Sequence, residues 1–178
     1  MERHGFIHEK LDIKLFILFI LRHLPDYISF EKLSDYVLVD DGFDYFEYTQ
    51  CLAELVDTGL IIQKDNCYKV TRKGARHVQT VESSLPYSVR NKAEKALAPL
   101  IEKMKRDALI GTNHKQLPKG GYKVELSLSD GIGEIVSVSI LAADEKQAVD
   151  MEKNFRDNAE TLYHSMIGLL SPQDKEKK

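Results

Sequence analysis

The chain has little cysteine and no long hydrophobic run, and each shortage argues against a class of protein. Only two of its 178 residues are cysteine, Cys51 and Cys67, which is too few for the disulfide framework of a small secreted domain. The longest apolar run, Leu15–Leu21, is far shorter than the roughly 20 residues of a membrane-spanning helix. No small-residue cleavage site follows this run, so we expect no signal peptide. We therefore expect a cytoplasmic protein with reduced thiols and no membrane contact.

Motifs for catalysis and for metal binding are also missing. There is no Gly-x-Ser-x-Gly nucleophile motif. His4 and His8 have a spacing that suits a metal on a helix, but no third ligand is placed to complete the three or four that a metal needs. Asp130–Gly133 is rich in glycine, yet no helix follows it to hold a phosphate, so we expect a hairpin turn. We expect no enzyme, no catalytic residue, no metal and no cofactor.

The small net charge of −3 hides a strong asymmetry along the chain. Residues 1–59 carry 5 Lys and Arg against 12 Asp and Glu, whereas residues 60–106 carry 11 against 4. Residues 107–178 are again acidic, with 9 against 12. Binding to phosphates needs local rather than global positive charge, so the middle third is the candidate surface for nucleic acid.

The stretch Phe43–Gly74 organises the N-terminal half. Phe43–Thr58 has apolar residues at helical spacing, and Gly59 follows where a left-handed cap residue is needed. Two β-prone runs, Leu60–Lys64 and Cys67–Thr71, flank Asp65-Asn66, which predicts a tight hairpin turn. Thr71-Arg72-Lys73-Gly74 then begins another helix.

Two helices are predicted before this stretch. Leu11–Leu24 is apolar on most faces, which indicates burial on more than one side, either within the domain or against a second protomer. Ser29 is a candidate N-cap for a helix from Phe30 to Val39. Asp40-Asp41-Gly42 forms the turn into the third helix, and residues 1–9 are expected to be a loose arm.

The C-terminal half is predicted to contain one long helix, a hairpin and a second long helix. Pro99 should kink or split the first of these helices. The predicted segments are a helix at Tyr87–Ile110, a polar connection at Gly111–Gly121, strands from Tyr122 and from Val136 on either side of the Asp130–Gly133 turn, a helix capped by Asp144, and a frayed tail at Ser171–Lys178.

The order of helix, Gly59-Leu60-Ile61, hairpin and Thr71-x-x-Gly74 resembles the recognition helix and wing of MarR- and PadR-like transcription regulators. The whole chain resembles a bacterial winged-helix family catalogued as domain of unknown function 4364. The match lies in Leu11–Leu24, in Leu55–Ile61 with Tyr68–Gly74, and in Leu85–Arg90 with the hairpin and helix after it. This resemblance implies a fold and a role as a regulator, and it brings no catalytic residue and no ligand.

We therefore predict an α+β fold with three parts. These are a winged helix-turn-helix domain at residues 1–83, a linking or dimerisation helix at 84–110, and a β-hairpin plus C-terminal helix at 111–178. The second protomer of a homodimer would pack on the middle helix, on the C-terminal part or on the first helix.

The predicted function is a DNA-binding transcriptional regulator that contacts double-stranded DNA. The third helix would contact bases and the wing with the following helix would contact phosphates, although Asp44 and Glu47 on the third helix have the wrong sign for phosphates. The expected DNA-binding residues are Tyr45, Thr49, Gln50, Lys64, Lys69, Arg72, Lys73 and Arg76.

Two alternatives stay open. In one, the domain binds a protein partner through Tyr45 and Phe46 and no longer binds DNA. In the other, the C-terminal part senses a small molecule and repositions the winged helix. The basic residues of the wing and the next helix are also consistent with an ordinary solvated face.

Overall fold

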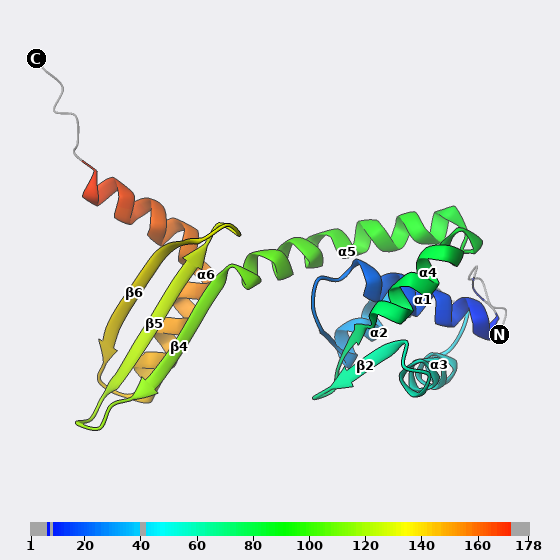
Figure 1. Ribbon diagram of the computed structural model, residues 1–178, viewed down its shortest axis with the longest axis horizontal. Coiled ribbons are helices and arrows are strands. Elements are labelled where there is room, and N and C mark those ends of the chain that lie inside the picture. Colours follow the sequence, from blue (N-terminus) through cyan, green and yellow to red (C-terminus); the bar gives the residue numbers. More distant parts are fainter. Residues whose placement is uncertain (1–6, 8, 40–41, 172–178) are drawn as a thin grey trace, which may run out of the picture. The chain divides into compact units, whose positions relative to one another are not determined.

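The structure is a computed structural model that describes residue 7, residues 9–39 and residues 42–171 (Figure 1). The spacing of His4 and His8, the Asp40-Asp41 part of the predicted turn, and the predicted tail after Ser171 lie outside these residues. The chain divides into two compact units, residues 1–104 and 105–178. Each contains helices and one antiparallel three-stranded sheet, so the predicted α+β class is confirmed.

The first unit places helices around a small sheet with strand order β1-β3-β2. β1 was not predicted, because two residues are too few to show an alternating pattern. In chain order the elements are α1 (Lys10–His23), β1 (Ile28–Ser29), α2 (Phe30–Val37), α3 (Tyr45–Asp57), β2 (Ile61–Lys64), β3 (Cys67–Val70), α4 (Arg72–Val81), a 3-10 turn (Glu82–Ser84) and α5 (Tyr87–Ala108), which continues into the second unit.

α1 lies at the centre of the first core. It packs against α2, α3, α4 and β3, and Val89, Ala93 and Leu97 of α5 join the same cluster. Burial on more than one side is therefore confirmed, and the apolar surface is covered within the unit. Leu11 is the only large apolar side chain of α1 that stays exposed. Ile7 is fully buried in this core, which corrects the expectation of a loose arm at that position.

The turns that join α3, the hairpin and α4 have the predicted backbone conformations. Gly59 has a φ of +68°, which is the left-handed conformation expected after the end of a helix. Asp65 and Asn66 have φ values of +48° and +58°, as a two-residue hairpin turn requires. The chain therefore reverses tightly between β2 and β3.

The Thr-x-x-Gly motif attaches α4 to the end of α3. The Thr71 hydroxyl accepts a hydrogen bond from Gly74 N at 3.0 Å and caps α4. The same hydroxyl lies 3.0 Å from Gly59 O and 3.1 Å from Leu60 O, to which it donates. A Cβ atom on Gly74 would lie 2.2 Å from Leu60 O, so only glycine allows this close approach. The motif thus fixes the start of α4 beside Gly59 and Leu60.

The second unit is a two-layer arrangement of one sheet and one helix. Its elements are β4 (Ile110–Gln116), β5 (Tyr122–Ser129), β6 (Glu134–Ala142) and α6 (Glu145–Leu170), with strand order β4-β5-β6. α6 covers one face of the sheet and lies mainly over β4 and β5. The core consists of Ile110, Val124, Leu126, Leu128, Ala142, Ala148, Phe155 and Ala159.

The structure corrects the prediction for this half at the polar connection and at the end of the middle helix. The predicted polar connection from Gly111 contains β4, which pairs with β5 from Ile110–Leu128 to Gln116–Tyr122. The predicted hairpin is therefore part of a three-stranded sheet. α5 continues through Pro99 without splitting and ends at Ala108, and Ile110 belongs to β4. The strands on either side of the Asp130–Gly133 turn and the Asp144 cap of α6 are confirmed.

Candidate nucleic-acid interface

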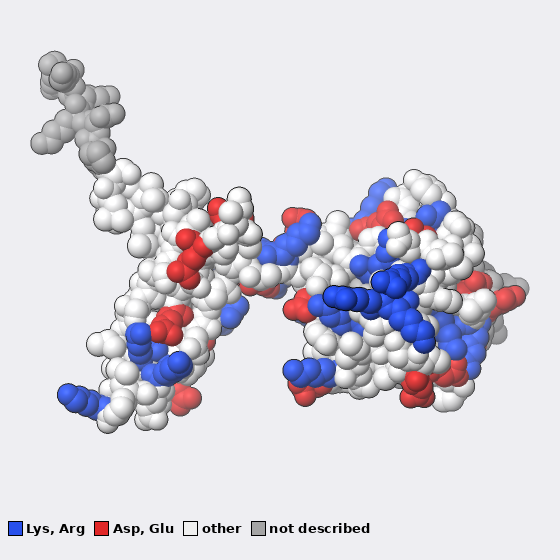
Figure 2. Space-filling view, viewed as in Figure 1, with Lys and Arg blue, Asp and Glu red and all other residues white. Residues whose placement is uncertain are grey.

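The first turn of α4 presents a group of exposed cations. Arg72, Lys73 and Arg76 are exposed, and Gly74 and Val78 of the same helix are buried. Residues three and four apart lie on the same face of a helix, so the three cations share the exposed face and Gly74 and Val78 share the buried one. Figure 2 shows Lys and Arg side chains gathered over α4. We name Arg72, Lys73 and Arg76 the α4 cations.

The α4 cations differ in how they are held. Lys73 Nζ donates a hydrogen bond to Thr58 O, the carbonyl at the end of α3, at 3.2 Å. Arg72 and Arg76 form no ion pair with any residue that the structure describes. Their charge is therefore available for an anion from solution.

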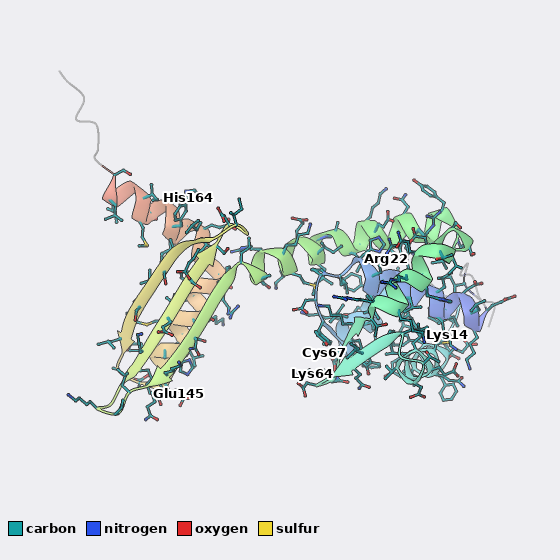
Figure 3. All side chains as sticks on the ribbon, in the orientation of Figure 1. Lys14, Arg22, Lys64, Cys67, Glu145 and His164 are labelled. Atoms are coloured by element: carbon teal, nitrogen blue, oxygen red, sulfur yellow. The ribbon has the colours of Figure 1, made fainter. Side chains whose placement is uncertain are left out.

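The hairpin contributes one available cation and one that is already paired. Lys64 is exposed at the end of β2, next to the turn (Figure 3). Lys69 lies 3.0 Å from Asp26 Oδ1 and 5.3 Å from the centre of the Tyr27 ring. Its hydrogen bond to Asp26 lowers the pKa of that carboxyl. Asp26 was not recognised from the sequence as the partner of Lys69, because 43 residues separate them.

The N-terminal part of α3 presents the polar and aromatic residues that were predicted to contact bases. Tyr45 is 56% exposed, and one side of its ring packs against Phe30 of α2 at 6.2 Å between centroids. Thr49 donates to Phe46 O at 3.0 Å, within the helix, and Gln50 is exposed. Of these, Tyr45 and Gln50 present the most accessible polar groups to a ligand.

Asp44 and Glu47 have a structural role that was not predicted from the sequence. The Asp44 carboxylate accepts from Glu47 N at 2.8 Å, and the Glu47 carboxylate accepts from Asp44 N at 3.0 Å. This is a capping box, which satisfies two backbone donors at the start of α3. The signal was present in the sequence as Asp44-x-x-Glu47, ahead of an apolar helical face. Asp44 and Glu47, whose negative charges are unfavourable for DNA binding, thus stabilise α3, the helix that is predicted to contact DNA.

Most of the predicted residues lie in two groups near opposite ends of α3. Phe30 N donates to Asn66 O at 3.1 Å, which holds the hairpin turn against the start of α2, where Phe30 also meets Tyr45. Lys64 and Tyr45 belong to this group. The α4 cations lie at the other end of α3, where Lys73 reaches Thr58. α3 has 13 residues, so the two groups are separated by about 20 Å.

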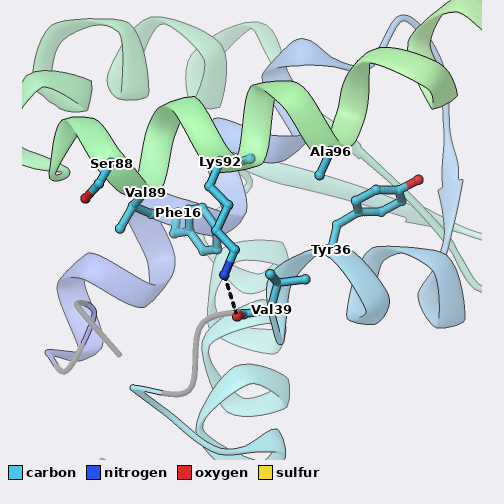
Figure 4. Close-up of a pocket in the computed structure, with 8 residues that line it drawn as sticks. Phe16, Tyr36, Val39, Ser88, Val89, Lys92 and Ala96 are labelled. Carbon is cyan, nitrogen blue, oxygen red and sulfur yellow. Dashed lines mark hydrogen bonds between the residues drawn. The ribbon is translucent and has the colours of Figure 1, made fainter. Parts of the chain in front are cut away.

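Two cavities in the first unit are alternative sites. The first, about 100 Å³, lies between α1, α2 and α5, where Lys92 Nζ donates to Val39 O at 3.4 Å (Figure 4). It is smaller than the roughly 300 Å³ at which ligand pockets begin. The second, about 340 Å³, has apolar walls that include Leu15, Leu55 and Leu60. Its lining also includes Asp12, His77 and Lys14, of which Lys14 is paired with Glu54.

The remaining candidate groups are the two thiols and the possible metal ligands. Cys51 is buried, as predicted, and burial raises the pKa of its thiol. Within the described ranges no three His, Cys, Asp or Glu side chains converge as metal ligands. None of the described helices is long and apolar enough to cross a membrane.

The fold and the surface define an α+β protein of two units whose first unit exposes cations on α4 and at its hairpin. The model of the family described as Domain of unknown function (DUF4364) matches residues 13–170, and the chain belongs to this family. No curated protein and no solved structure matches the chain. The similarity to MarR- and PadR-like regulators stays a prediction.

Proposed function

We propose that the first unit is a winged helix that binds double-stranded DNA, and that the protein is a cytoplasmic transcriptional regulator. The element order α1-β1-α2-α3-β2-β3, with strand order β1-β3-β2, supports the first part of this proposal, since a hairpin wing following a helix-turn-helix pair defines that fold. The observation that carries the DNA-binding part is the set of exposed cations without a carboxylate partner. On the hairpin and α4 these include Lys64, Arg72 and Arg76, which are exposed and form no ion pair with any described residue.

The arrangement suggests how such a complex would form. α3 enters the major groove, where Tyr45, Thr49 and Gln50 meet base edges or nearby phosphates. Lys64 lies toward one end of α3, and the α4 cations lie toward the other. A separation of about 20 Å is enough to reach the phosphate backbones on both sides of a groove about 12 Å wide. Most of the binding free energy is then electrostatic and independent of sequence.

Lys69 contributes less than predicted in this proposal, because its ammonium is already paired with Asp26. Lys73 should make an intermediate contribution to DNA binding. Its ammonium donates one hydrogen bond to Thr58 O and keeps further donors for a phosphate. The sites that matter most are therefore Arg72, Arg76 and Lys64.

The proposal is tested by removing these three charges and comparing with a matched control. Lys64→Ala, Arg72→Ala and Arg76→Ala together should weaken binding to random-sequence duplex DNA by at least ten-fold at low salt. They should also make the dependence of log affinity on log salt shallower by about one for each phosphate that the protein no longer neutralises. The control is Lys119→Ala, Lys146→Ala and Lys153→Ala, which removes the same charge from exposed positions of the second unit.

Fluorescence anisotropy of labelled DNA measures both affinities, and circular dichroism checks that the variants are folded. If the control weakens binding as much as the test variant does, the effect is one of net charge and the proposed surface is wrong.

A second candidate function rests on Phe46, which is 74% exposed although it is large and apolar. Phe46 and Tyr45 together form an aromatic surface beside Asp44 and Glu47, which favours a protein partner with apolar and basic groups. On this alternative, Phe46→Ala abolishes partner binding and the charge variants above have no effect. If Phe46→Ala changes neither partner binding nor DNA binding, the aromatic surface has no role in either.

A further inference from the structure

β6 is an edge strand, and no described strand pairs with its outer side. It pairs with β5 on one side only, because the strand order is β4-β5-β6. Toward its end, Ile140 is 39% exposed and Leu141 is 71% exposed. An open edge of this kind offers a row of unpaired backbone N–H and C=O groups to another strand.

This edge lacks the charges that usually prevent pairing between molecules. From Ile135 to Ala143 there is no charged residue and no proline. β4, the other edge of the sheet, contains Lys115, and charged residues on an edge strand discourage pairing. The one irregularity of β6 is a bulge near Ile135, which lies at the start of the strand and leaves Val136–Ala142 in regular register. The regular part of β6 is therefore both open and uncharged.

We propose that β6 pairs antiparallel with β6 of a second copy of this chain, around a two-fold axis at Val138. In this register Val136 of one copy lies opposite Ile140 of the other, and Ser137 lies opposite Ser139. Apolar residues thus meet apolar residues on the face that carries α6, and serines meet serines on the opposite face. A second copy is the partner that fits, because a two-fold axis repeats the same edge and an uncharged edge brings no like charges together.

The packing of α6 explains why this pairing would bury apolar surface. α6 lies mainly over β4 and β5, so Val136, Val138 and Ile140 of β6 are only partly covered. Opposite side chains in an antiparallel pair lie about 5 Å apart, so each copy covers the flanks of these residues in the other. The sheet grows from three strands to six, with both α6 helices on the same face, and reaches the usual size of a stable sheet.

The end of α6 adds exposed apolar surface to the same unit. α6 has 26 residues and is kinked at Asn158, whose φ of −129° and ψ of 15° are not helical, whereas β5 has only 8 residues. Figure 1 shows these last turns leaving the sheet on the side of β6. Leu169 is 85% exposed there and continues the apolar residues of the helix. A second copy across β6 would lie on the side toward which this surface extends.

The pairing of β6 does not depend on DNA binding, since it concerns the second unit alone. If both proposals hold, the dimer presents two α3 helices, and its DNA site would be two half-sites related by a two-fold axis.

The test is light scattering on the full chain at micromolar concentration, with two variants that differ only in the sign of one charge. Ser137→Lys with Ser139→Lys places like charges opposite each other across the axis, so the measured mass should fall from that of a dimer to that of a monomer. Ser137→Glu with Ser139→Lys places opposite charges there, so the dimer should persist. Position 139 faces Glu125 within the sheet and position 137 faces Ser127, so both variants should fold.

Circular dichroism checks the fold of both variants. A monomeric wild-type chain, a dimer that survives the double-lysine variant, or two monomeric variants would each overturn the proposed pairing.

Discussion

At the scale of single residues, Thr71 and Gly74 connect the hairpin, α3 and α4. One hydroxyl caps α4 and also donates to the backbone at Gly59 and Leu60, and the missing side chain of Gly74 lets the helix approach Leu60 O. The orientation of the α4 cations depends on this contact, because Arg72 and Lys73 lie between the two residues in the chain. The sequence motif was recognised, but the close approach became visible only in three dimensions.

We predict that Gly74→Ala destabilises the protein by about 1–3 kcal/mol, because the new Cβ atom must displace backbone rather than a flexible side chain. Chemical denaturation measures the change in the free energy of unfolding. Gly168→Ala is the control, since nothing lies within 4 Å of a Cβ atom there. In a helix this control should be neutral or stabilising by up to about 1 kcal/mol. Equal stability of the wild type and Gly74→Ala would refute the close packing described for α4.

Glu54 gives a prediction about pH. Its carboxylate receives hydrogen bonds from Lys10 and Lys14 of α1, which lower its pKa from the ordinary value of 4.5. A lowered pKa means that the pair contributes stability above that ordinary value and loses it as the pH falls through the folded value. Glu54→Gln should therefore be less stable than the wild type at neutral pH, and the difference should be smaller at a pH well below 4.5.

Denaturation curves of both proteins at the two pH values measure this difference. Asp57→Asn, an exposed change on the same helix, should show no comparable trend. If the difference in the free energy of unfolding between Glu54→Gln and the wild type is equally large in acid, the ion pairs of Glu54 are not its cause.

At the scale of elements, the two acidic residues at the start of α3 have opposite effects on helix stability and on the proposed DNA binding. Its capping box uses Asp44 and Glu47, which stabilise the helix start as hydrogen-bond acceptors and through the helix dipole. The same negative charges would repel phosphates near the end of the helix that would enter the groove. If the protein binds DNA, this end of α3 limits the affinity.

We predict that Asp44→Asn with Glu47→Gln raises the affinity for DNA and changes the stability by less than about 1 kcal/mol. Both replacements keep a side-chain oxygen that accepts the capping hydrogen bonds, but they remove two negative charges. Anisotropy titrations and thermal unfolding measure the two effects. Asp35→Asn with Asp150→Asn removes the same charge from exposed positions outside α3 and serves as the control. Unchanged DNA affinity in the α3 variant would place the DNA surface away from this end of α3.

The elements also show which features can be predicted from a sequence. Strong local signals were sufficient for α1, for the hairpin turn at Asp65-Asn66 and for the Asp144 cap, because each depends on neighbouring residues. β4 was missed because Gly111, Asn113 and Gln116 are weak strand formers, and the strand exists through its pairing with β5. Pro99 does not split α5, whose apolar side is held against the first core.

The sequence was sufficient to predict which cations belong to the candidate site, but not how they are grouped in space. The charge count located the basic segment, and each predicted cation lies on the hairpin or on α4. The arrangement of these cations in the structure depends on contacts between distant residues, such as Lys69 with Asp26 and Lys73 with Thr58. No local pattern contains that information, because each pair is brought together only by the fold.

At the scale of the whole molecule, an acidic protein carries a basic segment at residues 60–106, where Lys and Arg exceed Asp and Glu by 11 to 4. Electrostatic attraction to DNA then depends on local charge and must compete with repulsion from the rest of the chain. Such a protein should bind DNA tightly only at low salt unless a specific sequence adds base contacts.

The most direct measurement is a titration of the full wild-type chain into labelled random-sequence duplex DNA at low and at physiological salt, followed by fluorescence anisotropy. We predict saturable binding at low salt that falls steeply as salt rises, with a log–log slope of about −3 if Lys64, Arg72 and Arg76 each neutralise one phosphate. Absence of binding even at low salt would contradict the proposed DNA-binding function and leave the exposed aromatic surface of α3 as the functional site.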